Sequence, residues 1–92
     1  GAKTPNQKGI DFYNRLVDEL LAKGIKPFAT LFHWDLPQAL EDKNKGWLSL
    51  DTSKAFADYA GFMAEKLSDR VNHFFTLNEM WTFVELGYGI GI

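Results

Sequence analysis

Apolar residues recur at intervals of three and four along two long stretches of the chain. The first stretch places Phe12, Tyr13, Leu16, Val17, Leu20 and Leu21 on one side, and the second places Phe56, Tyr59, Ala60, Met63 and Leu67. Charged and amide side chains fill most positions between them, which is the pattern of a helix buried along one stripe. The sequence therefore predicts helices over about 7–23 and about 51–67. Gly24 would end the first helix, and Asp51 would be the N-cap of the second.

Each predicted helix is followed by a short and almost continuously apolar run, over 25–32 and 71–77. Such runs are typical of strands that are covered on both faces, as in parallel sheets. A loop with a short helix is expected over 34–40, with Pro37 in its first turn, and another short helix over 80–86. The order of elements contains one complete βαβ unit and predicts the α/β class.

Two parallel strands alone leave open edges and uncovered apolar surface. The glycine-spaced end at 87–92 is also too apolar for a natural solvated tail. No linker rich in Pro, Gly or Ser marks a domain boundary. We therefore expect residues 1–92 to lie in one domain, as a piece of a larger α/β protein.

Composition narrows the possible partners. The net charge of −2 is spread over intermixed acidic and basic residues, so there is no basic field that would hold nucleic acid. The chain has no cysteine and only two histidines, which excludes a thiolate metal site and makes a zinc centre improbable. No apolar stretch approaches the roughly 20 residues that cross a bilayer. We expect a soluble protein, slightly favour the cytoplasm, and expect a neutral or small polar ligand with no cofactor.

The run Thr76-Leu77-Asn78-Glu79 places an amide and a carboxylate at the end of the second predicted strand. Parallel α/β folds carry their chemistry at this end of their strands. On local pattern alone, an Asn-Glu pair in this position is more often a helix cap than a catalytic pair. His33 alone is likewise more often a loop histidine than a ligand, and a metal site of His33 with Asp35 lacks further partners.

The segment Phe28-Ala-Thr-Leu-Phe-His-Trp-Asp-Leu-Pro-Gln-Ala-Leu-Glu-Asp42 and the run Thr76 to Glu79 resemble family 1 glycoside hydrolases, the β-glucosidase family. Gly46-Trp47-Leu48, Tyr59-Ala60 and Asp69-Arg70-Val71 extend the resemblance over nearly the whole chain. His-Trp-Asp-Leu-Pro and Asn-Glu are together much more specific than either motif alone. The resemblance implies a (β/α)₈ barrel, in which this chain supplies about the third and fourth strands with their helices.

The resemblance also implies roles for individual residues. Glu79 matches the general acid/base of retaining β-glucosidases, and Asn78 matches the residue that hydrogen-bonds the sugar 2-hydroxyl. His33 and Trp34 match positions that line the sugar subsite, while Trp81 and Leu86 fall at the aglycone entrance. The chain departs from the usual family pattern at Met80, where a proline commonly follows the glutamate.

Retaining hydrolysis needs a second carboxylate about 5 Å from the first, as nucleophile. In the family this glutamate lies in a Thr-Glu-Asn-Gly context, and that tetrapeptide is absent from residues 1–92. Two hypotheses follow. The chain is a segment of a retaining β-glucosidase that acts on a β-glucoside or oligosaccharide together with the remaining barrel segments, or it is a non-catalytic barrel fragment or assembly module.

Overall fold

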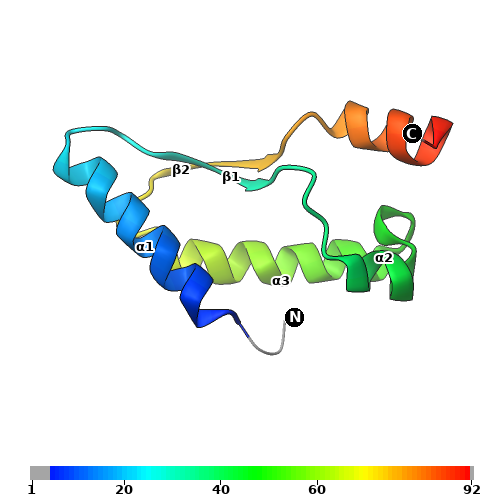
Figure 1. Cartoon of the computed structure of the whole chain (residues 1–92), viewed down its shortest axis with the longest axis horizontal. Coiled ribbons are helices and arrows are strands. Elements are labelled where there is room, and N and C mark those ends of the chain that lie inside the picture. The colour runs from blue at the N-terminus through cyan, green and yellow to red at the C-terminus, as the bar shows by residue number, and fades with distance from the viewer. Residues whose placement is uncertain (1–4, 92) are drawn as a thin grey trace.

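The computed structural model describes residues 5–91 of the chain. Its elements, in order, are α1 (Gln7–Ala22), β1 (Phe28–Phe32), α2 (Gln38–Asn44), the 3₁₀ turn η1 (Gly46–Leu48), α3 (Leu50–Leu67), β2 (His73–Leu77) and the π-helical segment η2 (Thr82–Ile90). Figure 1 shows β1 and β2 side by side, with both long helices on one side of the strand pair. The segment after β2 extends over the region of α2.

The two strands form a parallel pair, as the sequence predicts. Phe28 lies opposite His73 and Phe32 opposite Leu77, so the strands start and end at matching levels. The connection from β1 to β2 runs through α2, η1 and α3, which completes the predicted βαβ unit.

Both strands begin later than the apolar runs predict. The Ile25 N–H donates to the Leu20 carbonyl, which makes Ile25 part of the turn that ends α1. The Val71 N–H donates to the Leu67 carbonyl in the same way, at the end of α3. The backbone N–H groups of these residues donate to helix carbonyls and not to a neighbouring strand. The strand ladder therefore starts only at Phe28 and His73.

The predicted start of α1 is confirmed and that of α3 is wrong by two residues. Asn6 caps α1 by accepting from the Gly9 N–H, and Gly24 follows the helix with a left-handed φ of 72°. In α3 the N-cap is Ser49, whose Oγ accepts from the Asp51 N–H at 3.1 Å. Ser49 has extended backbone angles and is the last residue outside the helix, so its hydroxyl, not the Asp51 carboxylate, meets the first free amides.

The segment after β2 is helical for longer than predicted. Helical structure starts at Met80 and continues past Leu86 to Ile90, in the wide turns of a π-helix. Gly91 then ends it with a left-handed φ of 85°. Most of the glycine-spaced end is therefore ordered, and Ile92 lies outside the described residues.

A small aliphatic core lies where the chain enters the strands. Val17 of α1, Leu67 of α3 and Val71 are buried, and Ala29, Met63 and Phe74 pack against them. Arg70 closes this end by donating hydrogen bonds to Asp18 Oδ1 at 2.8 Å and to Asn14 Oδ1, which ties α1 to the start of β2. Its hydrogen bonds to Asp18 and Asp69 raise the pKa of Arg70.

The strand pair has uncovered apolar surface, as expected for two parallel strands alone. Phe28 and Phe75, which lie side by side on the strand pair, are 54% and 58% exposed. Phe12 and Tyr13 on α1 are also about half exposed, so most of the predicted α1 stripe faces outward. Tyr59, which the pattern places in the core, is 43% exposed and therefore only partly buried. Within residues 5–91 we find no helix that could cross a membrane.

Candidate active site

The chain turns sharply just beyond the end of each strand. Trp34 and Glu79 each follow a strand end by two residues, and both have left-handed backbones, with φ of 74° and 43°. Residues other than glycine seldom adopt this left-handed backbone conformation. The bend breaks the alternation of side chains along β2, which is the condition for Asn78 and Glu79 to face one ligand together.

Hydrogen bonds around Asn78 join the two bends. Its N–H donates to the Phe32 carbonyl at 2.9 Å, and its own carbonyl accepts from Trp34 Nε1 at 3.0 Å. On the β1 side, the His33 N–H donates to Asp35 Oδ1 at 3.1 Å. The ends of β1 and β2 therefore form one connected unit.

The Asn78 side chain carries a buried donor with no partner. Its Nδ2 atom is inaccessible to solvent and makes no hydrogen bond with the described residues. An unpaired buried donor costs about 1–3 kcal/mol.

Glu79 is exposed and directly precedes the helical segment that leads into η2. Its backbone carbonyl accepts from the Thr82 N–H at 2.9 Å, and its Oε2 accepts from the Thr82 hydroxyl at 3.2 Å. The carboxylate thus bonds a side chain and does not cap a backbone amide, unlike the helix cap that the local pattern allows. Its Oε1 makes no hydrogen bond with residues 5–91 and is free to meet a ligand.

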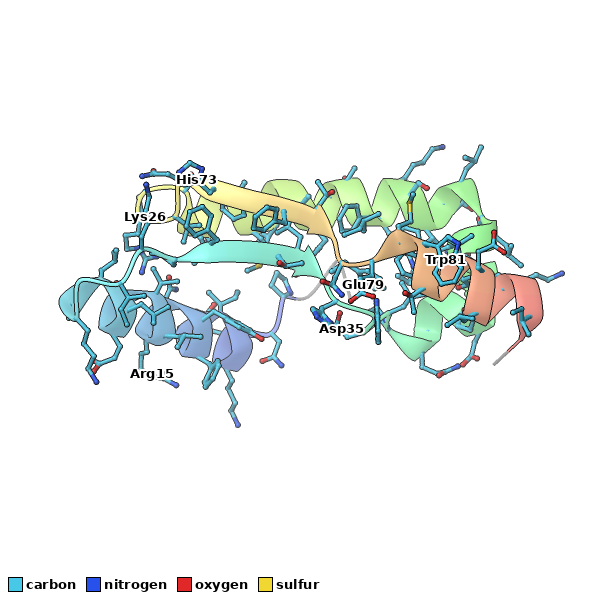
Figure 2. The ribbon with its side chains drawn as sticks, turned by 90° about the horizontal axis from the view of Figure 1, so that it is seen from above. Arg15, Lys26, Asp35, His73, Glu79 and Trp81 are labelled. Carbon is cyan, nitrogen blue, oxygen red and sulfur yellow. The ribbon has the colours of Figure 1, made fainter. Side chains whose placement is uncertain are left out.

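The other predicted site residues divide into two groups. His33 and Trp34 are exposed at the end of β1, with ring centroids 5.5 Å apart, and belong to the same strand end as Asn78 and Glu79. Trp81 and Leu86 lie on the segment that leaves this end, and Trp81 is 67% exposed. Figure 2 shows Glu79 beside Asp35 at the strand ends, with Trp81 farther along the chain.

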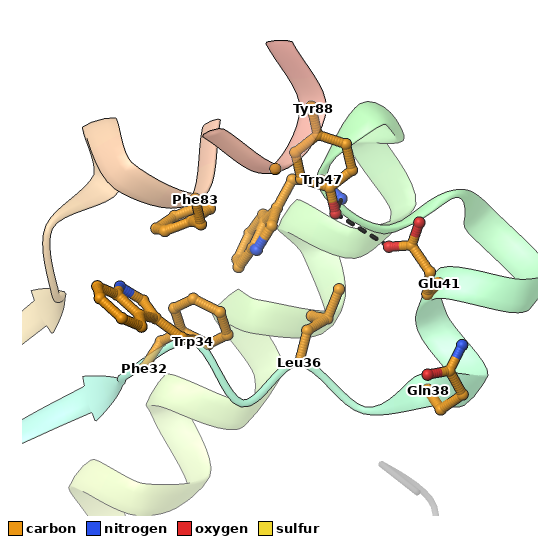
Figure 3. A pocket seen from close by; sticks show the side chains of 9 residues that line it. Phe32, Trp34, Leu36, Gln38, Glu41, Trp47, Phe83 and Tyr88 are labelled. Carbon is orange, nitrogen blue, oxygen red and sulfur yellow. Dashed lines mark hydrogen bonds between the residues drawn. The ribbon is translucent and has the colours of Figure 1, made fainter. Parts of the chain in front are cut away.

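An open cavity of about 340 Å³ lies next to this strand end, between the α2–η1 region and η2 (Figure 3). Its lining comes from Phe32, Trp34, Leu36, Gln38, Glu41, Trp47, Phe83, Gly87 and Tyr88. Trp34 is the one predicted site residue in this lining, so His33, Asn78 and Glu79 lie outside the cavity. The cavity walls are largely aromatic, with Phe32 edge-on to both Trp47 and Phe83 at 5.2 Å between ring centroids.

Two tyrosine hydroxyls hold this end of the molecule. Tyr59 of α3 donates to the Leu31 carbonyl of β1 at 2.7 Å, and burial, followed by the Asp35 carboxylate, raises the pKa of Tyr59. Tyr88 donates to Glu41 Oε2 at 3.0 Å, and burial is the main cause that raises the pKa of Tyr88. Both hydroxyls therefore stay protonated at neutral pH.

Sequence reasoning missed the structural roles of three residues that shape the site. Asp35 could have been found, because an aspartate two residues after a strand end commonly accepts from the backbone of a turn. Thr82 lies three residues after Glu79, the spacing at which neighbouring side chains on a helix meet. Tyr88 forms hydrogen bonds with residues more than forty positions away in the sequence, and no local sequence pattern predicts such contacts. Among residues 5–91 no three acidic, histidine or cysteine side chains are grouped to hold a metal.

Comparison with known proteins connects this geometry to one family. The family model described as "Glycosyl hydrolase family 1" matches residues 1–92. Beta-glucosidase 11 of Oryza sativa subsp. japonica is 53% identical over 87 residues, which are 95% of this chain and 16% of the relative. Raucaffricine-O-beta-D-glucosidase of Rauvolfia serpentina is 54% identical over the same share of this chain and 16% of its own length.

Solved structures that resemble this chain are β-glucosidases as well. A rice β-glucosidase mutant in a covalent complex with Glc superposes with a TM-score of 0.90 at 55% identity, over 91% of this chain and 18% of that one. The β-glucosidase of Thermotoga maritima in complex with deoxynojirimycin gives 0.88 at 49% identity, over 91% of this chain and 19% of that one. The chain thus spans less than a fifth of the length of these relatives.

Proposed function

Because the chain belongs to glycosyl hydrolase family 1, we propose that it is a segment of a retaining β-glucosidase and that it supplies the general acid/base. Its two parallel strands and their helices are part of a (β/α)₈ barrel. Residues 1–92 would then belong to a single catalytic domain. Since the relatives are more than five times longer, the remaining barrel segments would complete the site.

The observation that carries this proposal is the pair at the end of β2. Asn78 has a buried amide nitrogen without a partner, and the next residue, Glu79, has an exposed carboxylate. The sharp bend at Glu79 removes the strand alternation that would separate the two side chains. A carboxyl group and an amide donor on one bend suit a glycoside. The carboxyl group can protonate the glycosidic oxygen, and the amide can hydrogen-bond a hydroxyl of the sugar.

In the proposed reaction, the protonated Glu79 donates to the departing glycosidic oxygen. A nucleophilic carboxylate from another barrel segment attacks the anomeric carbon and forms a glycosyl-enzyme. Glu79, now ionised, takes a proton from water, and this water releases the sugar. The Asn78 amide donates to the 2-hydroxyl, an interaction that strengthens as positive charge develops on the ring.

The remaining predicted residues contribute to binding. His33 offers ring nitrogens to sugar hydroxyls, and Trp34 offers an indole face on which a sugar ring can pack. Trp81 and Leu86 would border the aglycone. The relatives include enzymes named for β-glucosides, so terminal β-linked glucosyl residues are the proposed substrates.

The strand pair favours one alternative, a barrel fragment or assembly module without catalysis. Its exposed apolar side chains are ones that a partner would cover. Intact mass spectrometry together with hydrolysis of an aryl β-glucoside separates the two functions. A mass near 10.5 kDa, no partner chain and no turnover would establish the alternative.

In active enzyme, the first prediction concerns the leaving group. Glu79→Gln should lower turnover about 10²–10⁴-fold for glucosides with poor leaving groups, because these need protonation, and much less for those with good leaving groups. Glu85→Gln, an exposed glutamate on η2, is the matched control and should behave like the unchanged enzyme. Equal losses for good and poor leaving groups would contradict the acid role of Glu79.

A further inference from the structure

The loop regions that follow β1 and β2 are also joined across the cavity beside the strand ends. The Tyr88 hydroxyl, on η2, donates to Glu41 Oε2 at 3.0 Å and accepts from the Trp47 backbone N–H at 3.0 Å. Glu41 belongs to α2 and Trp47 to η1, so one hydroxyl bonds both elements of the β1 loop region. Figure 3 shows Tyr88 and Glu41 meeting at the edge of the cavity. We call this three-residue contact the Tyr88 latch.

Gly46 makes room for the Tyr88 latch. The residue is buried and has a left-handed φ of 57°, and a Cβ added there would overlap both the Tyr88 hydroxyl and the Glu41 carboxylate. The hydroxyl therefore occupies space that only glycine leaves free.

A second contact holds the same face of η2. Phe83 packs against Phe32 and lies 5.8 Å from Trp47 between ring centroids. Phe83 and Tyr88 together anchor η2 to the β1 end and to η1 at two levels along its length. Because helical structure begins directly after Glu79, this anchoring sets how η2 leaves the strand end.

From these contacts we infer that Tyr88 is a positioning residue that determines aglycone specificity. By holding η2 to α2 and η1, the Tyr88 latch fixes Trp81 and Leu86 relative to the strand end, where the glucosyl unit is held. This role rests on the proposed function, in which those two residues border the aglycone. Tyr88 itself touches no reacting atom.

The first test measures the Tyr88 latch without any substrate. Hydrogen exchange in the full-length enzyme should show the Trp47 amide exchanging about tenfold faster in Tyr88→Phe, because that amide loses its acceptor. Tyr59→Phe is the matched control, since it removes a hydroxyl bonded to β1 and leaves η1 untouched. Unchanged Trp47 exchange in Tyr88→Phe, or equal acceleration in both variants, would overturn the Tyr88 latch.

The second test measures specificity with two β-glucosides, one with a large aromatic aglycone and one with a methyl group. Tyr88→Phe removes both hydrogen bonds of this hydroxyl and should raise KM for the large aglycone about fivefold, with KM for the methyl glucoside and both kcat values little changed. Tyr59→Phe should leave the ratio of the two KM values as it is.

The outcomes distinguish the inference from the function on which it rests. An unchanged KM ratio in an active Tyr88→Phe enzyme would overturn the specificity role alone. No turnover of any β-glucoside by the unchanged full-length enzyme would overturn the proposed function and the specificity role together, whatever the exchange result.

Discussion

The two ends of the β1–β2 pair differ in their hydrogen bonding, in their burial and in their backbone conformation. Where the chain enters β2, Arg70 bonds α1 and its own neighbour Asp69, and Val71 beside it is 1% exposed. Where the chain leaves the strands, Trp34 and Glu79 have left-handed backbones. Among residues 5–91, three buried polar side-chain atoms have no hydrogen-bond partner. They are Trp47 Nε1, Thr52 Oγ1 and Asn78 Nδ2, and all three lie toward this leaving end of the molecule.

The contrast shows how stability and chemistry are separated along two strands. At the entering end, hydrogen bonds are satisfied and apolar side chains are buried, which stabilises the fold. At the leaving end, left-handed backbones and an unpaired amide raise the free energy of the folded chain, where the proposed function places the ligand. Barrel enzymes place their active sites on this C-terminal face. Three predictions test the separation, ranked by their effect on the free energy of unfolding.

The largest effect is expected at the entering end, from Val71→Ala. Removing two buried methyl groups should lower the free energy of unfolding by about 2–3 kcal/mol, through lost burial and the cavity left behind. Turnover well below the melting temperature should be unchanged, because Val71 lies at the far end of the strand from Glu79. Denaturant unfolding and steady-state kinetics on the same preparation measure both. Lost turnover at unchanged stability would break the comparison.

An opposite result is expected at the leaving end, from Glu79→Asn. Asparagine tolerates a left-handed backbone better than glutamate, so the variant should be more stable by about 1 kcal/mol while its turnover collapses. Glu85→Asn is the matched control, because Glu85 lies inside η2 and gains nothing from this tolerance. Thermal unfolding of both variants measures the difference. A destabilised Glu79→Asn would mean that the bend is not strained by its side chain.

The residues at the entering end were largely predictable from sequence. The helical spacing of Val17 and Leu67 and the apolar run that contains Val71 place these residues in a core, and all three are buried. The order of elements and the parallel pairing also followed from local pattern. Local pattern works here because helix spacing and strand length respond to near neighbours.

The leaving end was predicted only in part. The motifs drew attention to Glu79 and Asn78, but the left-handed bends, the bond from Trp34 to Asn78 and the contacts of Tyr88 join residues distant in sequence. The exposure of Phe28 and Phe75 agrees with the uncovered apolar surface expected of two parallel strands alone. A continuous apolar run reports the surroundings of the strand in the whole barrel, whereas only neighbours within residues 5–91 cover it here.

The smallest expected effect is a loss of stability at alkaline pH, which should differ between the two ends. The pKa of Tyr59 is raised above its ordinary value of 10.0, mainly by burial, so the unfolded chain loses this proton first as pH rises. Stability from Tyr59 is therefore fully present below about pH 10 and is lost as pH rises through the folded pKa. Arg70 keeps its charge over this range because its pKa is raised further, so alkaline pH should weaken the leaving end before the entering end.

Unfolding followed at a series of alkaline pH values measures this effect. Tyr59→Phe should lower stability at neutral pH, by removing the bond to the Leu31 carbonyl, and should also make the decline above pH 10 shallower than in the unchanged protein. Val71→Ala removes no ionisable group, so it should shift the whole curve downward and keep its slope. A decline as steep in Tyr59→Phe as in Val71→Ala would show that Tyr59 does not link the leaving end to alkaline pH.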